Sequence, residues 1–155
     1  MYIIIPIILL ILDQATKFYA ISHFKGQEML EIIPNWLYFT YVENRGAAFG
    51  LLNDKPWFFT IVASVFVITM TVILLKNRNN INSFYSFSIA IIIVGALGNL
   101  IDRLLHGYVV DFIYSPLNGF YSFPVFNLAD AYLTVMAIVL GVYIFFIDGD
   151  SNVDK

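Results

Sequence analysis

Cysteine is absent from this chain of 155 residues. Its absence excludes disulfide bonds, thiolate metal sites and a cysteine nucleophile. Histidine is almost as scarce, because only His23 and His106 are present, far apart, and no HExxH sequence occurs. Two separated histidines supply too few ligands for a histidine-based zinc site. The sequence therefore predicts no metal site and no other cofactor.

Charge is also scarce. Charged residues make up 12% of the chain, the formal net charge is −3, and no basic run occurs. This composition excludes a nucleic-acid partner, which would require a basic surface. Apolar residues make up 60% and the mean hydropathy is +0.81, whereas a soluble domain is about 45–50% apolar and about 25% charged. We therefore expect an integral membrane protein with one domain, residues 1–155.

Four apolar stretches predict transmembrane helices, at about residues 2–24, 56–75, 84–105 and 126–147. Each has close to the ~20 residues that span the ~30 Å hydrocarbon core of a bilayer. The first stretch lacks the basic start and the small-residue cleavage site of a secretory signal peptide, so we expect it to be retained. Lys76 and Arg78 lie in the short second connection, which predicts that this connection and both termini are cytoplasmic.

Residues 25–55 interrupt this helical pattern. Residues 36–42 (WLYFTYV) are aromatic and β-branched and are bounded by turn residues, a composition that favours a strand. Residues 43–50 are too polar and glycine-rich to continue that strand. We expect a small sheet or extended platform at the surface of the membrane, on its outer face, with residues 108–125 as a loop on the same side. The predicted fold class is all-α and membrane-integral, with four transmembrane helices and a small β-structure.

Polar residues in this apolar background mark a candidate site, because a charge at membrane depth costs roughly 2.5–3.5 kcal/mol on insertion scales. In the third helix, Asn99, Asp102 and Arg103 share one stripe with Gly95. The candidates, all near predicted outer helix ends or in outer loops, are Asp13, Lys17, Asn44, Arg45, Asn99, Asp102, Arg103, Asp111, Asn127 and Asp130.

Simpler explanations exist for the same residues. The alternatives are an Asp13–Lys17 ion pair that softens an intramembrane charge, a helix cap formed by Asn127 and Asp130, an Asp102–Arg103 pair facing lipid head groups, and a solvated loop acid at Asp111. The accumulation of so many polar residues on one side of the membrane favours a functional site.

Two acids, Asp111 and Asp130, flank the short outer loop. A serine nucleophile would need a base, and neither Gly-x-Ser-x-Gly nor a nearby histidine is present. Two close carboxyl groups share one proton, so that one activates water and the other donates to the scissile carbonyl. We therefore predict a proteolytic pair. The alternatives are a small proton or ion translocator, with acids spread through the bilayer depth, and a non-enzymatic binding scaffold.

Four motifs resemble those of the bacterial lipoprotein signal peptidase family, signal peptidase II. They are DQATK (13–17), NRGAAFG (44–50), GALGNLIDRLLHGYVVDF (95–112) and FNLADAYL (126–133), in the order of the family and over nearly the full length. The resemblance implies an aspartic endopeptidase of the bacterial cytoplasmic membrane. Its substrate would be a diacylglyceryl-modified prolipoprotein, cleaved just before the lipidated lipobox cysteine.

The resemblance also implies residue roles. The catalytic dyad of the family falls on Asp111 and Asp130, and its supporting polar residues match Asp13, Lys17, Asn44, Asn99, Arg103 and Asn127. It implies that residues 25–55 belong to an extracytoplasmic β-cradle with a mobile lid. The expected partners are prolipoproteins and membrane lipids, with the chain acting as a monomer.

Physical chemistry adds candidate roles. We expect Arg103 to bind lipid oxygens, and Asn99 and Asn127 to orient the two carboxylates. The small residues Gly95 and Gly98 would leave room for an acyl chain or a helix.

Overall fold

The computed structural model describes residues 4–46, 55–77, 79–119 and 123–148. It contains the four predicted helices, α1 (Ile4–Phe24), α2 (Pro56–Asn77), α3 (Ser83–His106) and α4 (Leu128–Tyr143), the last continued by a π-helical turn, Ile144–Asp148. All four are long and apolar enough to cross a membrane. The prediction of four membrane helices is therefore confirmed.

Short polar signals set the helix ends. The side chain of Asn82 accepts a hydrogen bond from the backbone N–H of Tyr85 and caps α3, which ends at Gly107 with a left-handed φ of 78°. Glycine adopts this conformation without the penalty that a Cβ atom would bring. Asn127 caps α4, so this helix begins two residues later than the predicted position 126. The preceding residue, Phe126, ends a strand.

The strands form one antiparallel sheet in the order β1-β2-β3-β4: β1 (Leu30–Ile33), β2 (Leu37–Asn44), β3 (Val109–Ser115) and β4 (Phe123–Phe126). Two predictions were wrong here. Residues 108–125 contain two strands rather than a loop, and β2 continues through Glu43 and Asn44. Asn44 pairs with Val109 and Val42 with Asp111, so pairing with a distant segment overrides the weak strand preference of these polar residues.

Part of the expected platform cannot be compared with the structure. Residues 47–54, which complete the NRGAAFG motif, lie outside the described residues. The lid that the resemblance implies therefore stays a prediction.

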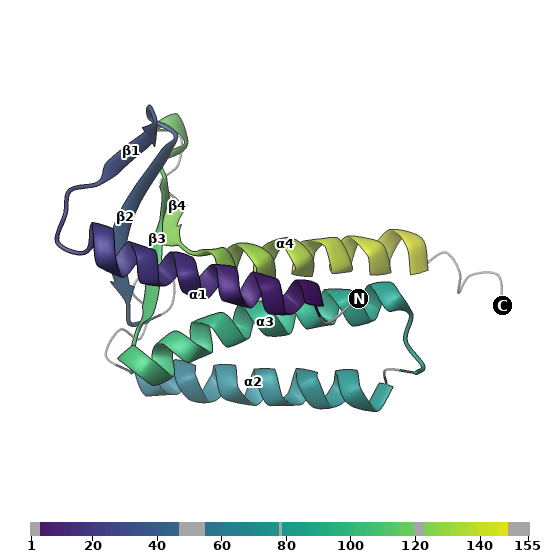
Figure 1. Cartoon of the computed structure of the whole chain (residues 1–155). Coiled ribbons are helices and arrows are strands. Elements are labelled where there is room, and N and C mark those ends of the chain that lie inside the picture. The colour runs from purple at the N-terminus through teal and green to yellow at the C-terminus, as the bar shows by residue number, and fades with distance from the viewer. Residues whose placement is uncertain (1–3, 47–54, 78, 120–122, 149–155) are drawn as a thin grey trace.

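Figure 1 shows the sheet across one end of the helices, with the start of α1, the end of α4 and the α2–α3 connection at the other end. Helix α3 packs against α1, α2 and α4, and both α1 and α3 reach the sheet. A small core of Ala20, Val110 and Phe112 joins α1 to β3. The ends of α1 and α3, the start of α4 and two strands therefore meet in one region.

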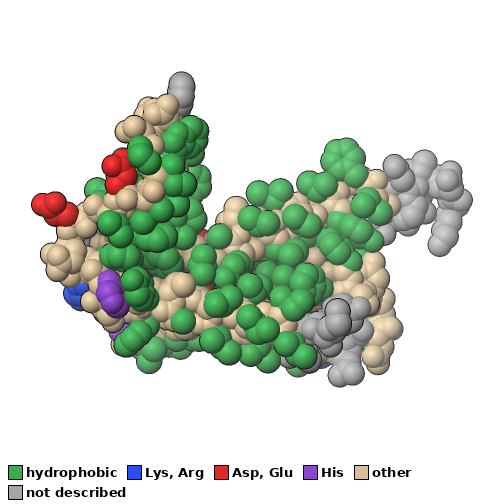
Figure 2. Space-filling model, turned by 45° about the horizontal axis from the view of Figure 1, so that its top comes forward, with side chains coloured by type: hydrophobic (Ala, Val, Ile, Leu, Met, Phe, Trp, Pro, Cys, Tyr) green, Lys and Arg blue, Asp and Glu red, His purple; other side chains and the backbone are tan. Residues whose placement is uncertain are grey.

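The outer surface of the helices is apolar. Large hydrophobic side chains are exposed along them, including Trp57, Ile68 and Phe145 at 60%, 63% and 74%. Figure 2 shows hydrophobic side chains over the helices, whereas the charged and histidine side chains visible on that face gather mainly at the sheet end. Apolar exposure on this scale belongs to a surface that faces lipid.

Candidate active site

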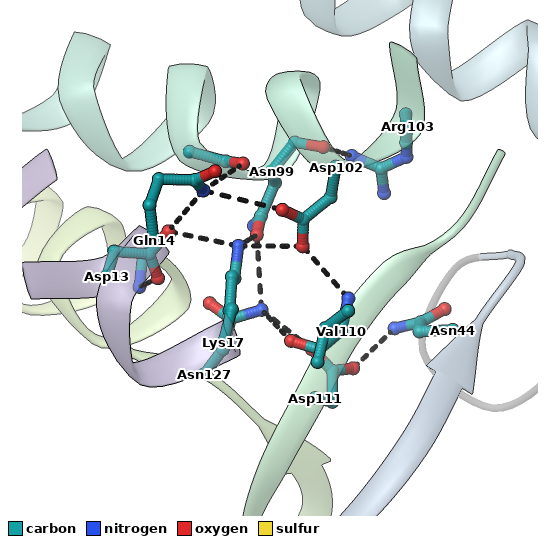
Figure 3. Close-up of polar contacts among 12 residues, drawn as sticks. Asp13, Gln14, Lys17, Asn44, Asn99, Asp102, Arg103, Val110, Asp111 and Asn127 are labelled. Atoms are coloured by element: carbon teal, nitrogen blue, oxygen red, sulfur yellow. Dashed lines mark hydrogen bonds and ion pairs between the residues drawn. The ribbon is translucent and has the colours of Figure 1, made fainter. Parts of the chain in front are cut away.

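The site is built around a buried cation, Lys17 of α1. Its ammonium nitrogen lies 3.0 Å from Asp13 Oδ2 and 3.0 Å from Asp102 Oδ2, and it donates to Asn99 Oδ1 over 2.9 Å (Figure 3). Lys17 is only 2% exposed, and both aspartates are also buried. A buried ammonium group is tolerated only when it is paired and hydrogen-bonded. The expected Asp13–Lys17 ion pair is confirmed, and it extends across to α3.

Asp102 connects this cation to the sheet. Its Oδ2 atom also accepts a hydrogen bond of 2.9 Å from the backbone N–H of Val110, the residue before Asp111. The alternative that paired Asp102 with Arg103 at the lipid head groups is therefore wrong, because Asp102 is 3% exposed and bonded to Lys17.

The prediction from sequence did not include Gln14. Its side-chain amide nitrogen donates to Asp13 Oδ2 over 3.1 Å, to the Gly98 carbonyl over 3.2 Å and to Asp102 Oδ1 over 3.3 Å. Gln14 thus ties α1 to α3 and supports both carboxylates that hold Lys17. The available signal was its position in the DQATK motif, next to Asp13.

Asparagine side chains hold both carboxylates of the predicted dyad. Asp111 Oδ1 accepts from Asn127 Nδ2 over 2.6 Å, and its Oδ2 accepts from Asn44 Nδ2 over 2.9 Å. Asp130 Oδ1 accepts from Asn99 Nδ2 over 2.7 Å, and its Oδ2 accepts from the backbone N–H of Asn127 over 3.3 Å. Every carboxylate oxygen therefore has a donor. The expectation that Asn99 and Asn127 donate to these groups is confirmed.

The buried cation fixes which way Asn99 points. Asn99 Oδ1 accepts from Lys17 Nζ and, over 3.1 Å, from Asn127 Nδ2. Both groups can only donate, so they must face the amide oxygen, and the Asn99 NH₂ group is left to face Asp130. Lys17 is thereby linked to the dyad through one amide.

At the start of α4, Asn127 and Asp130 form both the helix cap and part of the candidate site. Asn127 Oδ1 accepts from the backbone N–H of Asp130 over 2.9 Å, and Asp130 returns a bond to Asn127, which completes a capping box. The backbone N–H of Ala129 donates to Asp13 Oδ1 over 2.9 Å. The helix cap and the site are therefore the same structure, and the first turn of α4 positions the Asp130 carboxyl group.

Burial, and to a smaller extent the negative charge of Asp130, raise the pKa of Asp111 to about 7. The hydrogen bonds from Asn44 and Asn127 oppose this rise because they stabilise the carboxylate. A pair in this environment can hold one proton near neutral pH. Within the described residues, no group of three or more His, Asp or Glu side chains is placed to hold a metal ion.

Arg103 lies beside an open groove between α2, α3 and α4, with a volume of about 320 Å³. Its guanidinium lies 5.9 Å from the ring centre of Phe59 and donates weakly to the Asn99 carbonyl over 3.5 Å. Asn99, Phe66 and Leu133 also line the groove. Among the described residues Arg103 forms no ion pair. Its planar guanidinium therefore faces a mainly apolar groove, which is also lined by Asn99, the hydrogen-bond donor to Asp130.

The expected space beside Gly95 and Gly98 is filled by protein. A Cβ atom at Gly98 would lie 2.6 Å from Asp13 Oδ2, and one at Gly95 would lie 2.7 Å from the Ala129 carbonyl oxygen. These glycines therefore let α1 and α4 approach α3. Of the two occupants expected for this face, an acyl chain or a helix, the structure has helices.

The structure does not bring Arg45 to the dyad. Its guanidinium pairs with Glu43 over 2.9 Å and lies 5.5 Å from the ring centre of Tyr108, with 61% of the side chain exposed. The other nine candidates lie in or directly beside the polar network around Lys17 and the dyad.

Comparison with known proteins identifies the family. The family model described as "Signal peptidase (SPase) II" matches residues 5–146. The chain belongs to the signal peptidase II family. It is 40% identical over 149 residues to the lipoprotein signal peptidase of Clostridium tetani, covering 96% of this chain and 95% of that protein. It is 42% identical over 150 residues to that of Caldanaerobacter subterraneus, covering 96% and 99%.

A solved structure agrees with this family assignment. A bacterial membrane enzyme determined by the in meso method at 1.9 Å resolution matches with a TM-score of 0.79 and 36% identity, covering 94% of this chain and 93% of that one. Signal peptidase II is a peptidase family, so the protein is a membrane peptidase.

Proposed function

We propose that this protein is an intramembrane aspartic endopeptidase, built as one membrane-embedded domain, in which Asp111 and Asp130 form the catalytic dyad. Family membership supports the removal of signal peptides from prolipoproteins. The substrates in this proposal are diacylglyceryl-modified prolipoproteins, cleaved just before the lipidated lipobox cysteine. The observation that carries the proposal is the clamp of asparagine donors on both carboxyl groups, together with the raised pKa of Asp111.

The mechanism follows from one shared proton. The ionised carboxylate accepts a proton from a water molecule, whose oxygen attacks the scissile carbonyl carbon while the other carboxyl group donates its proton to the carbonyl oxygen. When the tetrahedral intermediate collapses, the C–N bond breaks and the protonated carboxyl group gives its proton to the leaving amine. The other carboxylate takes a proton from a hydroxyl group of the intermediate, which restores one shared proton on the dyad. The products are the signal peptide with a new carboxylate and the lipoprotein with a free cysteine amine. The asparagine amides hold the two carboxyl groups in place throughout.

The groove beside Arg103 suits a lipidated, apolar substrate. Its walls from Phe59, Phe66 and Leu133 favour acyl or apolar side chains, and Arg103 can donate to an ester or carbonyl oxygen. Membrane lipids are therefore part of the expected surroundings. The proposal has no nucleic-acid partner and has the enzyme acting as a monomer.

The sheet end faces the extracytoplasmic side of the bacterial cytoplasmic membrane in this proposal, and both termini face the cytoplasm. Two observations support it: α1 begins and α4 ends away from the sheet (Figure 1), and Lys76 lies in the last turn of α2 at that same end. Cytoplasmic connections carry an excess of lysine and arginine. A proton or ion translocator is not favoured, because the acids gather in one network instead of being spread through the bilayer depth.

The test is cleavage of a diacylated lipobox peptide by purified protein, with N-terminal sequencing of the product and an unlipidated peptide for comparison. Asp111→Asn and Asp130→Asn should each lower kcat by about 10²–10⁴-fold, the usual contribution of a general acid or base. Glu28→Gln, which alters an exposed acid before β1, should cleave normally. Normal cleavage by either dyad variant would show that the acids are not catalytic, and equal cleavage of both peptides would exclude lipid recognition.

A further inference from the structure

Two cations share one carboxylate where α1 and α3 meet the sheet. Glu43 Oε1 lies 3.1 Å from Lys25 Nζ, and Glu43 Oε2 lies 2.9 Å from Arg45 Nη2. Lys25 directly follows α1, and Arg45 directly follows β2. These three side chains carry a net charge of +1, in a chain whose net charge is −3.

Two tyrosines hold the cations in place. The Lys25 ammonium nitrogen lies 5.2 Å from the ring centre of Tyr41, and the Arg45 guanidinium carbon lies 5.5 Å from the ring centre of Tyr108. The Tyr41 hydroxyl group lies 3.2 Å from that of Tyr108 and donates to Glu43 over 3.2 Å. We refer to Lys25, Tyr41, Glu43, Arg45 and Tyr108 as the cation–tyrosine cluster. Its members come from three separate segments, so the fold assembles it.

The cluster keeps its charge and has donors to spare. Hydrogen bonds from Arg45 and Lys25 lower the pKa of Glu43 to about 2, so the net charge stays +1 near neutral pH. Among the described residues, each cation donates one hydrogen bond, to Glu43, although a guanidinium has five N–H donors and an ammonium has three. More than half of each side chain is exposed, at 52% and 61%. An anion with several acceptor oxygens can therefore bind both cations.

Apolar surface continues from the cluster along the helices. Leu104 and Leu105, in the last turn and a half of α3, are 66% and 69% exposed, and Phe18 of α1 is 72% exposed. Figure 2 shows histidine and basic side chains at the sheet end next to hydrophobic side chains of the helices. Cations at the end of a lipid-facing helix lie at head-group depth, where they attract anionic lipid.

We propose that the cation–tyrosine cluster binds the phosphate group of an anionic phospholipid in the leaflet next to the sheet. Lys25 and Arg45 donate to the phosphate oxygens, and the acyl chains lie along the exposed apolar side chains of α1 and α3. This site is separate from the dyad, because its hydrogen bonds and ion pairs within the described part of the chain do not reach the network around Lys17. It would hold the sheet at a fixed depth at the membrane surface.

Binding is tested on the full chain in one detergent, without any prolipoprotein, by native mass spectrometry of bound lipid. Wild type is titrated with phosphatidylglycerol, with phosphatidylcholine of the same acyl chains, and with inorganic phosphate. We expect phosphatidylglycerol to bind most tightly. Lys25→Gln/Arg45→Gln should weaken its binding about 30-fold, from about fivefold per basic residue near the surface.

A second variant predicts the opposite change. Glu43→Gln raises the cluster charge from +1 to +2 and should tighten phosphatidylglycerol binding about fivefold. Lys76→Gln removes a single exposed cation at the far end of α2 and serves as the control; it should weaken binding by no more than about fivefold, the effect of one basic residue. Equal binding of the two lipids, equal binding by the double variant and the control, weaker binding by Glu43→Gln, or phosphate binding as tight as lipid binding would each overturn the proposal. Because no substrate is cleaved, these outcomes are independent of the dyad.

Discussion

Replacing Lys17 with methionine tests the central claim about the site, that a buried cation holds it together. Methionine keeps most of the apolar length of the side chain and removes the ammonium group. Asp13 and Asp102 would then be left buried without the cation that lies 3.0 Å from each. Asn99 Oδ1 would also lose one of its two donors.

The expected loss of stability is large. Removing one partner of a buried ion pair typically costs about 3–5 kcal/mol, because an uncompensated charge stays buried. The summed charge of Asp13, Lys17 and Asp102 is −1, and it becomes −2 when methionine replaces the lysine. Gln14 and the backbone N–H groups of Val110 and Ala129 still donate to the two carboxylates. We therefore expect a destabilisation of about 3 kcal/mol, the lower end of that range.

The assay is unfolding of the purified protein in mixed micelles with increasing denaturing detergent, followed by the fluorescence of Trp36 and Trp57. The matched variant is Lys17→Met/Asp102→Asn, which returns the local charge to −1 and keeps an oxygen acceptor for Val110. It should be more stable than the sum of the two single effects, by at least about 1 kcal/mol of coupling.

Two results would refute this reasoning. One is a destabilisation by Lys17→Met of less than about 1 kcal/mol, the level of an exposed ion pair. The other is strict additivity in the double variant, which would mean that Lys17 and Asp102 act independently.

Two further predictions concern proton sharing and packing. Catalysis needs one protonated carboxyl group, so activity should fall as pH rises through the pKa of Asp111, about 7. Asn44→Ala should move this alkaline fall to higher pH, because it removes a donor that lowers the pKa of Asp111. A pH–rate profile that Asn44→Ala leaves unchanged would contradict this. Between the ordinary value of 3.8 and about 7, the folded protein holds a proton that the unfolded chain has lost, so this group makes the free energy of unfolding fall as pH rises in that window. Gly98→Ala should destabilise the protein by about 1–3 kcal/mol through overpacking against Asp13. Gly141→Ala, where an added Cβ meets nothing within 4 Å, should be neutral or slightly stabilising in the same unfolding assay, and equal effects of the two substitutions would contradict the packing argument.

The helices and the main site residues were predictable because local chemistry dominates there. Long apolar runs have few alternatives to a membrane helix, and intramembrane polar residues stand out against them. The i, i+4 spacing of Asp13 and Lys17 was enough to predict their ion pair, which the structure confirms.

The remaining features depend on contacts between distant segments. Strand β3 pairs with β2, and the β-branched and aromatic run YVVDFIY at residues 108–114 is a local strand signal that the prediction of a loop overlooked. Asp102 and Arg103 were considered as a pair because they are neighbours, yet successive residues of a helix point about 100° apart. Only the packing of α1 against α3 decides that Asp102 faces Lys17 while Arg103 faces the groove.

Gln14 and Arg45 illustrate opposite errors. Gln14 carries no charge and was not selected, although three acceptors converge on its amide. Arg45 was selected as a charged residue in an outer loop, but the strand ends at Asn44 and the Arg45 side chain pairs with Glu43 and lies over the Tyr108 ring. Proximity in sequence is a poor guide where a strand ends.

The Asp13–Lys17 pair also bears on how the protein is assembled in the membrane. Helix α1 precedes α3 and α4 in the chain, so it enters the bilayer before Asp102, Asn99 and Ala129 are available to it. An isolated lysine or aspartate at that depth would oppose insertion. Because each lies one turn from the other, α1 brings its own counter-ion, and the same two side chains later recruit α3 and α4. The order of synthesis is thereby compatible with a polar centre that is complete only when the last helix arrives.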